Sequence, residues 1–169
     1  MDIVCAWCKK DMGSKPSVKY PERFVTHGIC DECTAGLLRP IEPTLMGYLD
    51  NLGVPVLVVG ADVVVDYANK HSRELLQKEM PKIEGLRGGD VFECAHSRLP
   101  GGCGKTIHCI GCAIRNTITD TYSTGISHLR TPAYLIQGTP DDNHEVKFLI
   151  STEKAGEVVL LRIDEVGEH

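Results

Sequence analysis

The chain has 169 residues, with 18 Lys and Arg against 23 Asp and Glu, and a formal net charge of −5. This length suits one ordinary domain, or one domain with a small appendage. The acidic balance argues against broad binding to a phosphate backbone. There is no apolar run of about 18 residues, so we expect no membrane span. The N-terminal segment lacks the features of a signal peptide, so we expect a cytoplasmic protein.

The eight cysteines fall into two groups of four, with none between or beyond them. We call the first group the first cysteine set: Cys5, Cys8, Cys30 and Cys33. We call the second group the second cysteine set: Cys94, Cys103, Cys109 and Cys112. Stable disulfides are rare in a reducing cytosol, so thiols grouped in this way indicate metal binding or redox chemistry.

The first cysteine set has the spacing of a structural zinc site, with two C-x-x-C pairs separated by 21 residues. Each short pair lets two thiolates converge on one ion at about 2.3 Å, and the second pair completes the tetrahedron. The intervening segment has almost no apolar core, so we expect metal binding to supply much of its folding free energy. Trp7 is expected to pack, and His27 to remain unliganded. Residues 1–38 are therefore predicted to form a four-cysteine Zn²⁺-binding module.

Residues 5–10 (C-A-W-C-K-K) and 26–33 (T-H-G-I-C-D-E-C) resemble a short zinc-ribbon-like module of bacterial signalling proteins.

The segment that follows, residues 39–53, is expected to be a linker and an amphipathic helix. Pro40 and Pro43 interrupt any earlier helix, and Thr44 can cap a short one. Its apolar stripe consists of Leu45, Leu49 and Leu52. We expect this stripe to pack on its own domain or against the same helix of a second chain.

Residues 54–169 have the pattern of an α+β domain. Two β-branched runs, 54–59 and 63–68, flank a turn and predict a hairpin, and Asn69 can cap a short helix after it. An irregular middle stretch is followed by three strand candidates, 126–136, 146–152 and 158–166. This order predicts a five-stranded antiparallel sheet with helices on one face.

These residues resemble a PAS domain over about residues 45–168. The resemblance is carried by the hairpin end 66–69 (D-Y-A-N), the helix residues 74–76, the segment 85–92 (G-L-R-G-G-D-V-F) and the closing strands 150–166. It implies a cytosolic sensing and dimerisation module that holds a small molecule or cofactor between sheet and helices. From the resemblance we expect a homodimer and a separate signalling output protein, and we expect no enzyme activity.

The second cysteine set has the irregular spacing C-x8-C-x5-C-x2-C and lies within the Cys-rich segment 94–112. In a PAS domain this region lies over the ligand pocket. The loop 100–104 (P-G-G-C-G) exposes amides that can bond to sulfur. Cys112 precedes a predicted helix over 113–122, whose N-terminus favours thiolate. Positive charge nearby should act in the same direction, from Arg98, Lys105 and Arg115.

Thiolates held in this way suit several groups: an iron–sulfur cluster, a second Zn²⁺, a reversible dithiol switch or simple buried thiols. Iron–sulfur clusters accept four-thiolate ligation at varied spacings, which favours the cluster. Similar Cys-rich PAS segments occur in bacterial sensor proteins.

His96 and His108 flank the cysteines and are expected to be loop residues rather than ligands. A c-type haem is excluded because Ala113 follows Cys112.

Two other functions remain open from the sequence. A thiol–disulfide oxidoreductase could use Cys109 and Cys112, whose C-x-x-C leads into a helix, although such sites normally follow a strand in a βαβ unit. A zinc-dependent nucleic-acid-binding transcription regulator is the other alternative, and the acidic balance makes nucleic-acid binding the weaker expectation. We therefore expect a PAS-like sensor of redox state or of a small ligand, acting through its second cysteine set on a separate partner.

Overall fold

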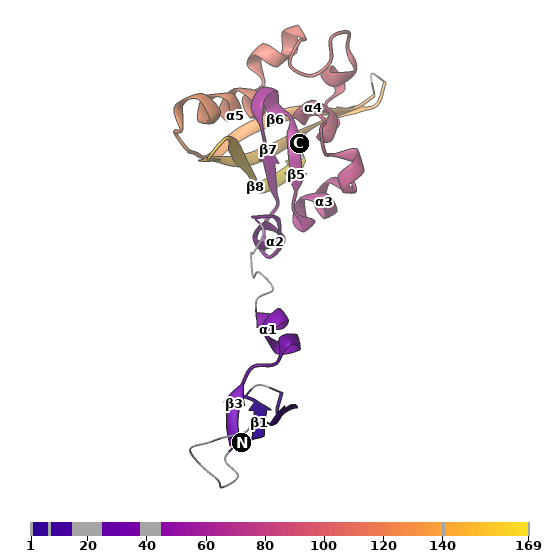
Figure 1. Ribbon diagram of the computed structural model, residues 1–169. Helices are drawn as coiled ribbons and strands as arrows, with labels where there is room; N and C mark the ends of the chain where they lie inside the picture. Colours follow the sequence, from indigo (N-terminus) through magenta and orange to yellow (C-terminus); the bar gives the residue numbers. More distant parts are fainter. Residues whose placement is uncertain (1, 7, 15–24, 38–44, 140, 169) are drawn as a thin grey trace. The chain divides into compact units, whose positions relative to one another are not determined.

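The computed structural model describes residues 2–6, 8–14, 25–37, 45–139 and 141–168. The chain divides into two compact units, Met1–Pro43 and Thr44–His169, which we call the small unit and the large unit. Each is described by itself, with its elements labelled as in Figure 1. Our expectations for Trp7, Pro40, Pro43 and Thr44 fall outside the described residues.

The small unit contains a three-stranded sheet in the order β2-β1-β3, in which β1 runs antiparallel to β2 and parallel to β3. Its elements are β1 (Asp2–Cys5), β2 (Asp11–Ser14), β3 (Val25–Gly28) and α1 (Asp31–Leu37). Among its described residues, the only buried hydrophobic ones are Cys5 and Cys30. In the described part of the unit, Cys5 and Cys30 therefore take the place of an apolar core.

The large unit begins with α2 (Leu45–Asp50) and the hairpin strands β4 (Val56–Val59) and β5 (Val65–Ala68), joined by the 3₁₀ turn η1 (Ala61–Val63). The middle of the chain is helical and irregular: α3 (Lys70–Leu76), η2 (Met80–Lys82), α4 (Gly88–Val91), η3 (Ala95–Arg98), η4 (Ile107–Gly111) and α5 (Ala113–Thr124). Three long strands close it: β6 (His128–Gly138), β7 (Asn143–Ala155) and β8 (Val158–Glu168). No helix in the described ranges is long and apolar enough to cross a membrane.

The five strands form one antiparallel sheet in the order β5-β4-β8-β7-β6. The first strand of this sheet, β4, thus lies beside the last, β8, and the helices α3 to α5 are inserted between the hairpin and the three closing strands (Figure 1). This arrangement confirms the predicted α+β fold with a PAS-like five-stranded sheet. Each strand boundary lies within a few residues of its predicted position.

The main core lies between one face of this sheet and the helices α3 to α5. Alternate β7 residues Val146, Phe148 and Ile150 are buried there, as strand geometry requires. Phe92, directly after α4, packs edge-to-face on Phe148 with ring centroids 5.5 Å apart. This contact anchors the start of the cysteine-rich segment to the sheet.

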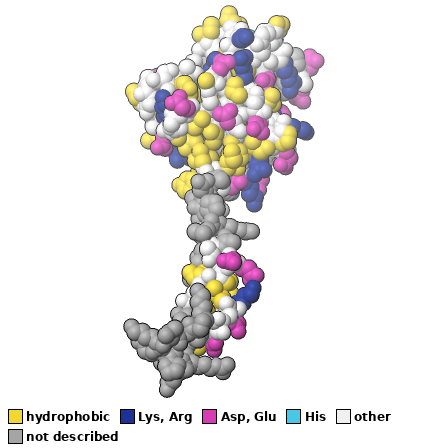
Figure 2. Space-filling view, in the orientation of Figure 1, with side chains coloured by type: hydrophobic (Ala, Val, Ile, Leu, Met, Phe, Trp, Pro, Cys, Tyr) yellow, Lys and Arg dark blue, Asp and Glu magenta, His cyan; other side chains and the backbone are white. Residues whose placement is uncertain are grey.

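A smaller apolar cluster lies on the other face, where Leu49 of α2 packs against Val56 and Val58. Hydrophobic side chains also gather over this part of the large unit in Figure 2. Of the predicted leucine stripe, Leu49 is buried and Leu52 packs, partly buried, against the same cluster, beyond the helix end at Asp50, whereas Leu45 is exposed. The predicted helix was therefore too long, but two of its three leucines pack on the domain that follows, which is one of the two expected arrangements.

Asn69 joins α2, β4 and α3 through four hydrogen bonds. Its fully buried side chain accepts from the amides of Val56 and Ser72, both at 3.0 Å, so the predicted N-cap of α3 is confirmed. Its amide group donates to the carbonyls of Leu49 and Val54, both at 2.8 Å. All four hydrogen-bonding positions of the side chain are therefore used.

Candidate metal and cysteine sites

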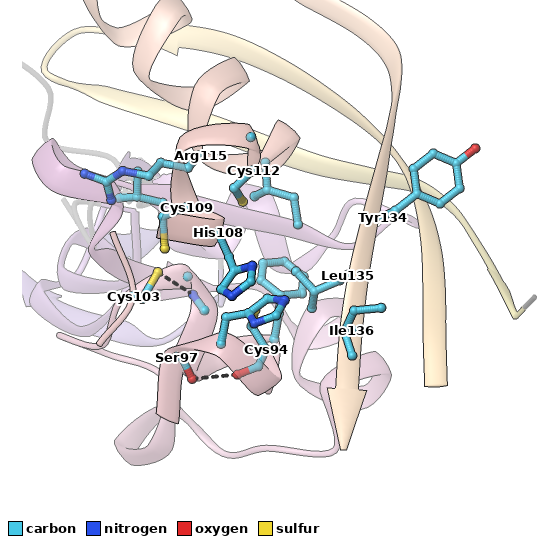
Figure 3. A pocket seen from close by; sticks show the side chains of 17 residues that line it. Cys94, Ser97, Cys103, His108, Cys109, Cys112, Arg115, Tyr134, Leu135 and Ile136 are labelled. Atoms are coloured by element: carbon cyan, nitrogen blue, oxygen red, sulfur yellow. Dashed lines mark hydrogen bonds between the residues drawn. The ribbon is translucent and has the colours of Figure 1, made fainter. Parts of the chain in front are cut away.

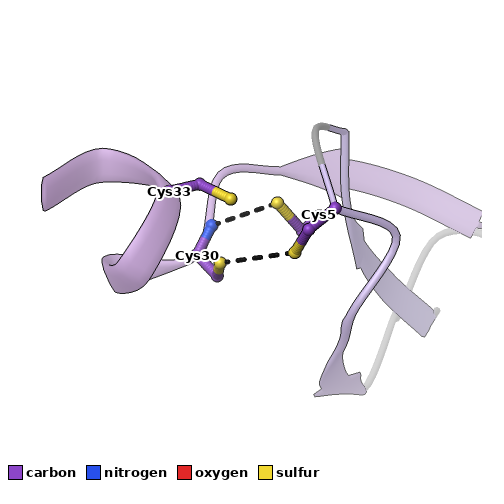
Figure 4. Close-up of side chains that lie close together, drawn as sticks. Cys5, Cys30 and Cys33 are labelled. Carbon is purple, nitrogen blue, oxygen red and sulfur yellow. Dashed lines mark hydrogen bonds between the residues drawn. The ribbon is translucent and has the colours of Figure 1, made fainter. Parts of the chain in front are cut away.

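The first cysteine set forms a tight group in the small unit. Cys5 ends β1, Cys30 precedes α1, and Cys33 lies within α1, so the strand end and the helix start bring the two C-x-x-C pairs together (Figure 4). The four Sγ atoms all lie within 4.8 Å of one another, and none of the four cysteines is in a disulfide. The Sγ atoms of Cys8 and Cys30 are 3.7 Å apart. Four sulfurs at about 2.3 Å from one ion would be about 3.8 Å apart, so these thiols are close enough to hold a metal ion.

Neighbouring thiols of the first cysteine set perturb the ionisation of Cys33. Hydrogen bonding with Cys30, and then with Cys8, raises the pKa of Cys33 to about 12. Crowded thiols resist ionisation in this way unless a metal compensates the charge of the thiolates. His27 is exposed on β3 and does not belong to the group of converging ligand atoms.

The second cysteine set lines a cavity of about 180 Å³ in the large unit (Figure 3). Its members come from four places: Cys94 at the N-cap of η3, Cys103 in the loop between η3 and η4, Cys109 within η4 and Cys112 at the N-cap of α5. Cys94 and Cys112 also pack against the main core. The inner wall of the cavity is therefore the core between α5 and the sheet.

Backbone amides approach two of these sulfurs closely. The Gly89 amide donates to Cys103 Sγ at 3.2 Å, and the Gly104 amide donates to Cys109 Sγ at 3.1 Å. A Cβ atom on Gly89 would lie 2.8 Å from Cys103 Sγ, and Gly104 has a φ of +89°. Glycine is therefore required at both positions. The sequence predicted the contribution of the 100–104 loop but not that of Gly89, whose role depends on the packing of α4 against the loop.

The four thiols are not equivalent. Burial raises the pKa of Cys94 and of Cys103. Burial also acts to raise the pKa of Cys109, but hydrogen bonding with Thr106 and with the Gly104 amide outweighs it, so the pKa of Cys109 lies below its usual value. The expected effect of nearby positive charge is found at Cys109, whose pKa the charge of Arg115 also lowers, whereas desolvation dominates at the half-buried Cys94 and Cys103.

Two arginines beside the cavity share one carboxylate. Asp62, in the turn between β4 and β5, accepts from Arg87 at 2.6 Å and from Arg115 at 2.7 Å. Arg87 also donates to the Cys103 carbonyl at 3.0 Å, which connects the turn to the cysteine loop. The Nη1 atom of Arg115, a cavity-lining residue, is buried and has no hydrogen-bond partner. No local sequence pattern indicates this network, because Asp62 lies 53 positions before Arg115.

The cavity also contains a pair of stacked imidazoles. The rings of His96 on η3 and His108 on η4 are parallel within 11°, and their centroids are 3.8 Å apart. Both residues line the cavity, His96 half-buried and His108 exposed. Burial, and then the charge of His108, lower the pKa of His96. The expectation of two ordinary loop histidines missed this contact.

No protein-family model and no curated protein matches the chain significantly. Solved structures with a similar arrangement include a LOV protein of Rhodobacter sphaeroides, at 14% identity and a TM-score of 0.46 over 73% of this chain. The chain spans 64% of that protein.

Two further similar structures are domains of about the size of the large unit. A PAS domain from Desulfitobacterium hafniense has 15% identity and a TM-score of 0.41, over 73% of this chain and 99% of that one. A photoactive yellow protein domain of a sensor histidine kinase from Rhodospirillum centenum has 12% identity and a TM-score of 0.43, over 71% and 92%. The strand order and the inserted helices of the chain itself remain the basis for its PAS-like fold.

Proposed function

We propose that this protein is a sensory signalling module whose second cysteine set holds an iron–sulfur cluster, and whose first cysteine set holds a structural zinc ion. The observation that carries the proposal is the convergence of Cys94, Cys103, Cys109 and Cys112 on one cavity between the helices and the sheet. Pockets of this kind, enclosed by a fold and lined by a few convergent reactive groups, are the usual place of a cofactor.

The spacing of the thiols supports different groups at the two sites. Among the described residues, only the first cysteine set brings three or more metal-ligating atoms within 4.8 Å of one another. One zinc ion requires that closeness. In a four-iron cluster each thiolate binds its own iron, so the sulfurs must stand further apart. The second cysteine set does not form such a close group among the described residues, so a cluster fits it better than a single ion.

The surroundings of the second cysteine set also fit a sulfur-rich anion. The amides of Gly89 and Gly104 already point at sulfur, and such hydrogen bonds tune the potential of a cluster. Arg115 lines the cavity, and its buried Nη1 atom has no hydrogen-bond partner. This nitrogen is therefore a donor available to a negatively charged cluster in the cavity. A cluster bound there would supply one-electron redox chemistry. The protein would supply ligands, hydrogen bonds and a partly closed environment.

Two of the cysteines connect the cavity to the sheet. Cys94 pairs with Gln137 of β6 in a β-bridge, and the Gln137 side chain donates to the Phe92 carbonyl at 2.7 Å. Cys112 is the N-cap of α5, whose Ile114 and Ile118 lie in the main core. A change in ligation would therefore act on β6 and α5 together. We propose that this is how the state of the site reaches an output protein, with the chain acting as a homodimer.

Hydrogen–deuterium exchange on the full chain tests this sensing function. Protein purified without oxygen is compared before and after oxidation with ferricyanide, and a variant with all four cysteines of the second set changed to serine is the control. We expect oxidation to increase exchange in α5 and β6 of the wild type and to leave the variant unchanged. Equal responses in the two proteins, or none in the wild type, would refute the sensing function.

A further inference from the structure

The stacked imidazoles join the two segments that carry Cys94 and Cys109. His96 lies on η3, two residues after Cys94, and His108 directly precedes Cys109 on η4. Ring centroids 3.8 Å apart place the two faces in van der Waals contact. The hydrogen bonds of the loop between them include Gly102 to Leu99 and Lys105 to Gly102, both within the loop itself. The ring pair is therefore a direct contact between η3 and η4.

The geometry of the pair excludes joint ligation of one ion. A metal ion binds an imidazole nitrogen at about 2.0–2.1 Å, along the lone pair in the plane of the ring. Two nearly parallel planes separated by a stacking distance share no such position. The pair must break before both rings can bind the same ion, so the stacked arrangement indicates a role other than shared ligation.

The rings are placed to cover the cavity. Both residues line the cavity: His96 is half-buried, and His108 is exposed to solvent on the outer side of the pair. Figure 3 shows His108 in the midst of the labelled cysteines. Two stacked rings are rigid and present apolar faces, so they exclude water from what lies beneath them.

We propose that His96 and His108 are positioning residues that together close the cavity of the second cysteine set and hold η3 against η4. This role rests on the proposed function, because the cavity they cover is the one assigned to the cluster. The test of this role measures the reactivity of the thiols in metal-free protein. Its outcome therefore does not depend on whether the second cysteine set binds a cluster.

The experiment measures alkylation by iodoacetamide at each cysteine of the chelator-treated full chain, under argon, by peptide mass spectrometry. The proteins are the wild type, His96→Ala, His108→Ala and His108→Phe. His128→Ala is the matched control, because His128 is also partly exposed and interacts with Asp120 at 2.7 Å but lies outside the cavity lining. The first cysteine set serves as an internal reference in every sample.

We expect each alanine variant to speed alkylation of Cys94 and Cys112 by roughly two- to tenfold, the range that an aromatic pair contributes to a closed state. His108→Phe should react like the wild type, because phenylalanine can stack but cannot ligate or titrate. His128→Ala should also match the wild type. Unchanged rates in both alanine variants would overturn the proposal, and so would a phenylalanine variant as fast as the alanine variant.

Circular dichroism of each variant separates loss of closure from loss of fold. If an alanine variant unfolds, the comparison of His108→Phe with the wild type decides: equal rates support closure by a ring, and faster alkylation refutes it. If the purified protein contains no iron, the proposed cluster fails, while these alkylation rates still test the closure.

Discussion

Replacing Asn69 with leucine removes four hydrogen bonds at one buried position. The helix cap on Ser72 contributes about 1 kcal/mol. The amide of Val56 and the carbonyls of Leu49 and Val54 would each be left without their partner, at about 1 kcal/mol or more apiece. Burial of the new apolar side chain offsets about 1 kcal/mol of this. We therefore expect a loss of about 3 kcal/mol in the free energy of unfolding.

For a unit of this size, that loss corresponds to a fall of about 10 °C in Tm. The assay is thermal unfolding of the full chain followed by circular dichroism. Asn51→Leu is the matched control, because Asn51 is exposed and makes a single side-chain hydrogen bond, to the Gly47 carbonyl at 2.9 Å. Its effect should stay within about 0.5 kcal/mol. Equal Tm values for the two leucine variants would refute the reasoning, since the buried bonds would then contribute no more than an exposed one.

Three further predictions follow from the charges and thiols. Asp62→Asn should lower Tm at pH 7. The hydrogen bond from Arg115 lowers the pKa of Asp62 in the folded protein, so the ionised carboxylate stabilises the fold above the usual aspartate pKa. This contribution to the free energy of unfolding is lost as the pH falls below about 4. An equal difference between the two proteins at pH 7 and pH 3 would contradict this. A zinc chelator should abolish the structure of the small unit, seen as loss of amide protection in residues 25–37, while the large unit keeps its Tm; protection that survives chelation would show that the unit folds without metal. In metal-free protein at pH 7, Cys109 should be alkylated faster than Cys103, because the pKa of Cys109 is lowered and that of Cys103 is raised. The reverse order of alkylation rates would contradict this difference in pKa.

Most of the fold could be predicted because its signals are local. The β-branched runs, the turn after residue 59 and the cap at Asn69 are each read from a few adjacent residues. The cysteine pairs of the small unit are equally local, since each C-x-x-C brings two thiols together by itself. Their convergence on one point then follows from joining a strand end to a helix start.

The chemistry of the second site depends on contacts that no short pattern contains. Gly89 reaches Cys103 only because α4 packs on the loop, and Asp62 reaches Arg115 only because α5 returns to the β4–β5 turn. The stacking of His96 and His108 likewise depends on how an irregular loop closes. The four cysteines were identified from composition, whereas their unequal pKa values follow from burial that only the tertiary structure defines.

Metal and sulfide analysis of protein purified without oxygen tests the central claim most directly. The wild type is compared with one variant lacking the first cysteine set and one lacking the second, each with four serines. We predict a brown wild type that contains zinc, iron and acid-labile sulfide. Loss of the second set should remove iron and sulfide alone, and loss of the first set should remove zinc alone. A colourless wild type with two zinc ions, or with no metal bound by the second set, would contradict the account.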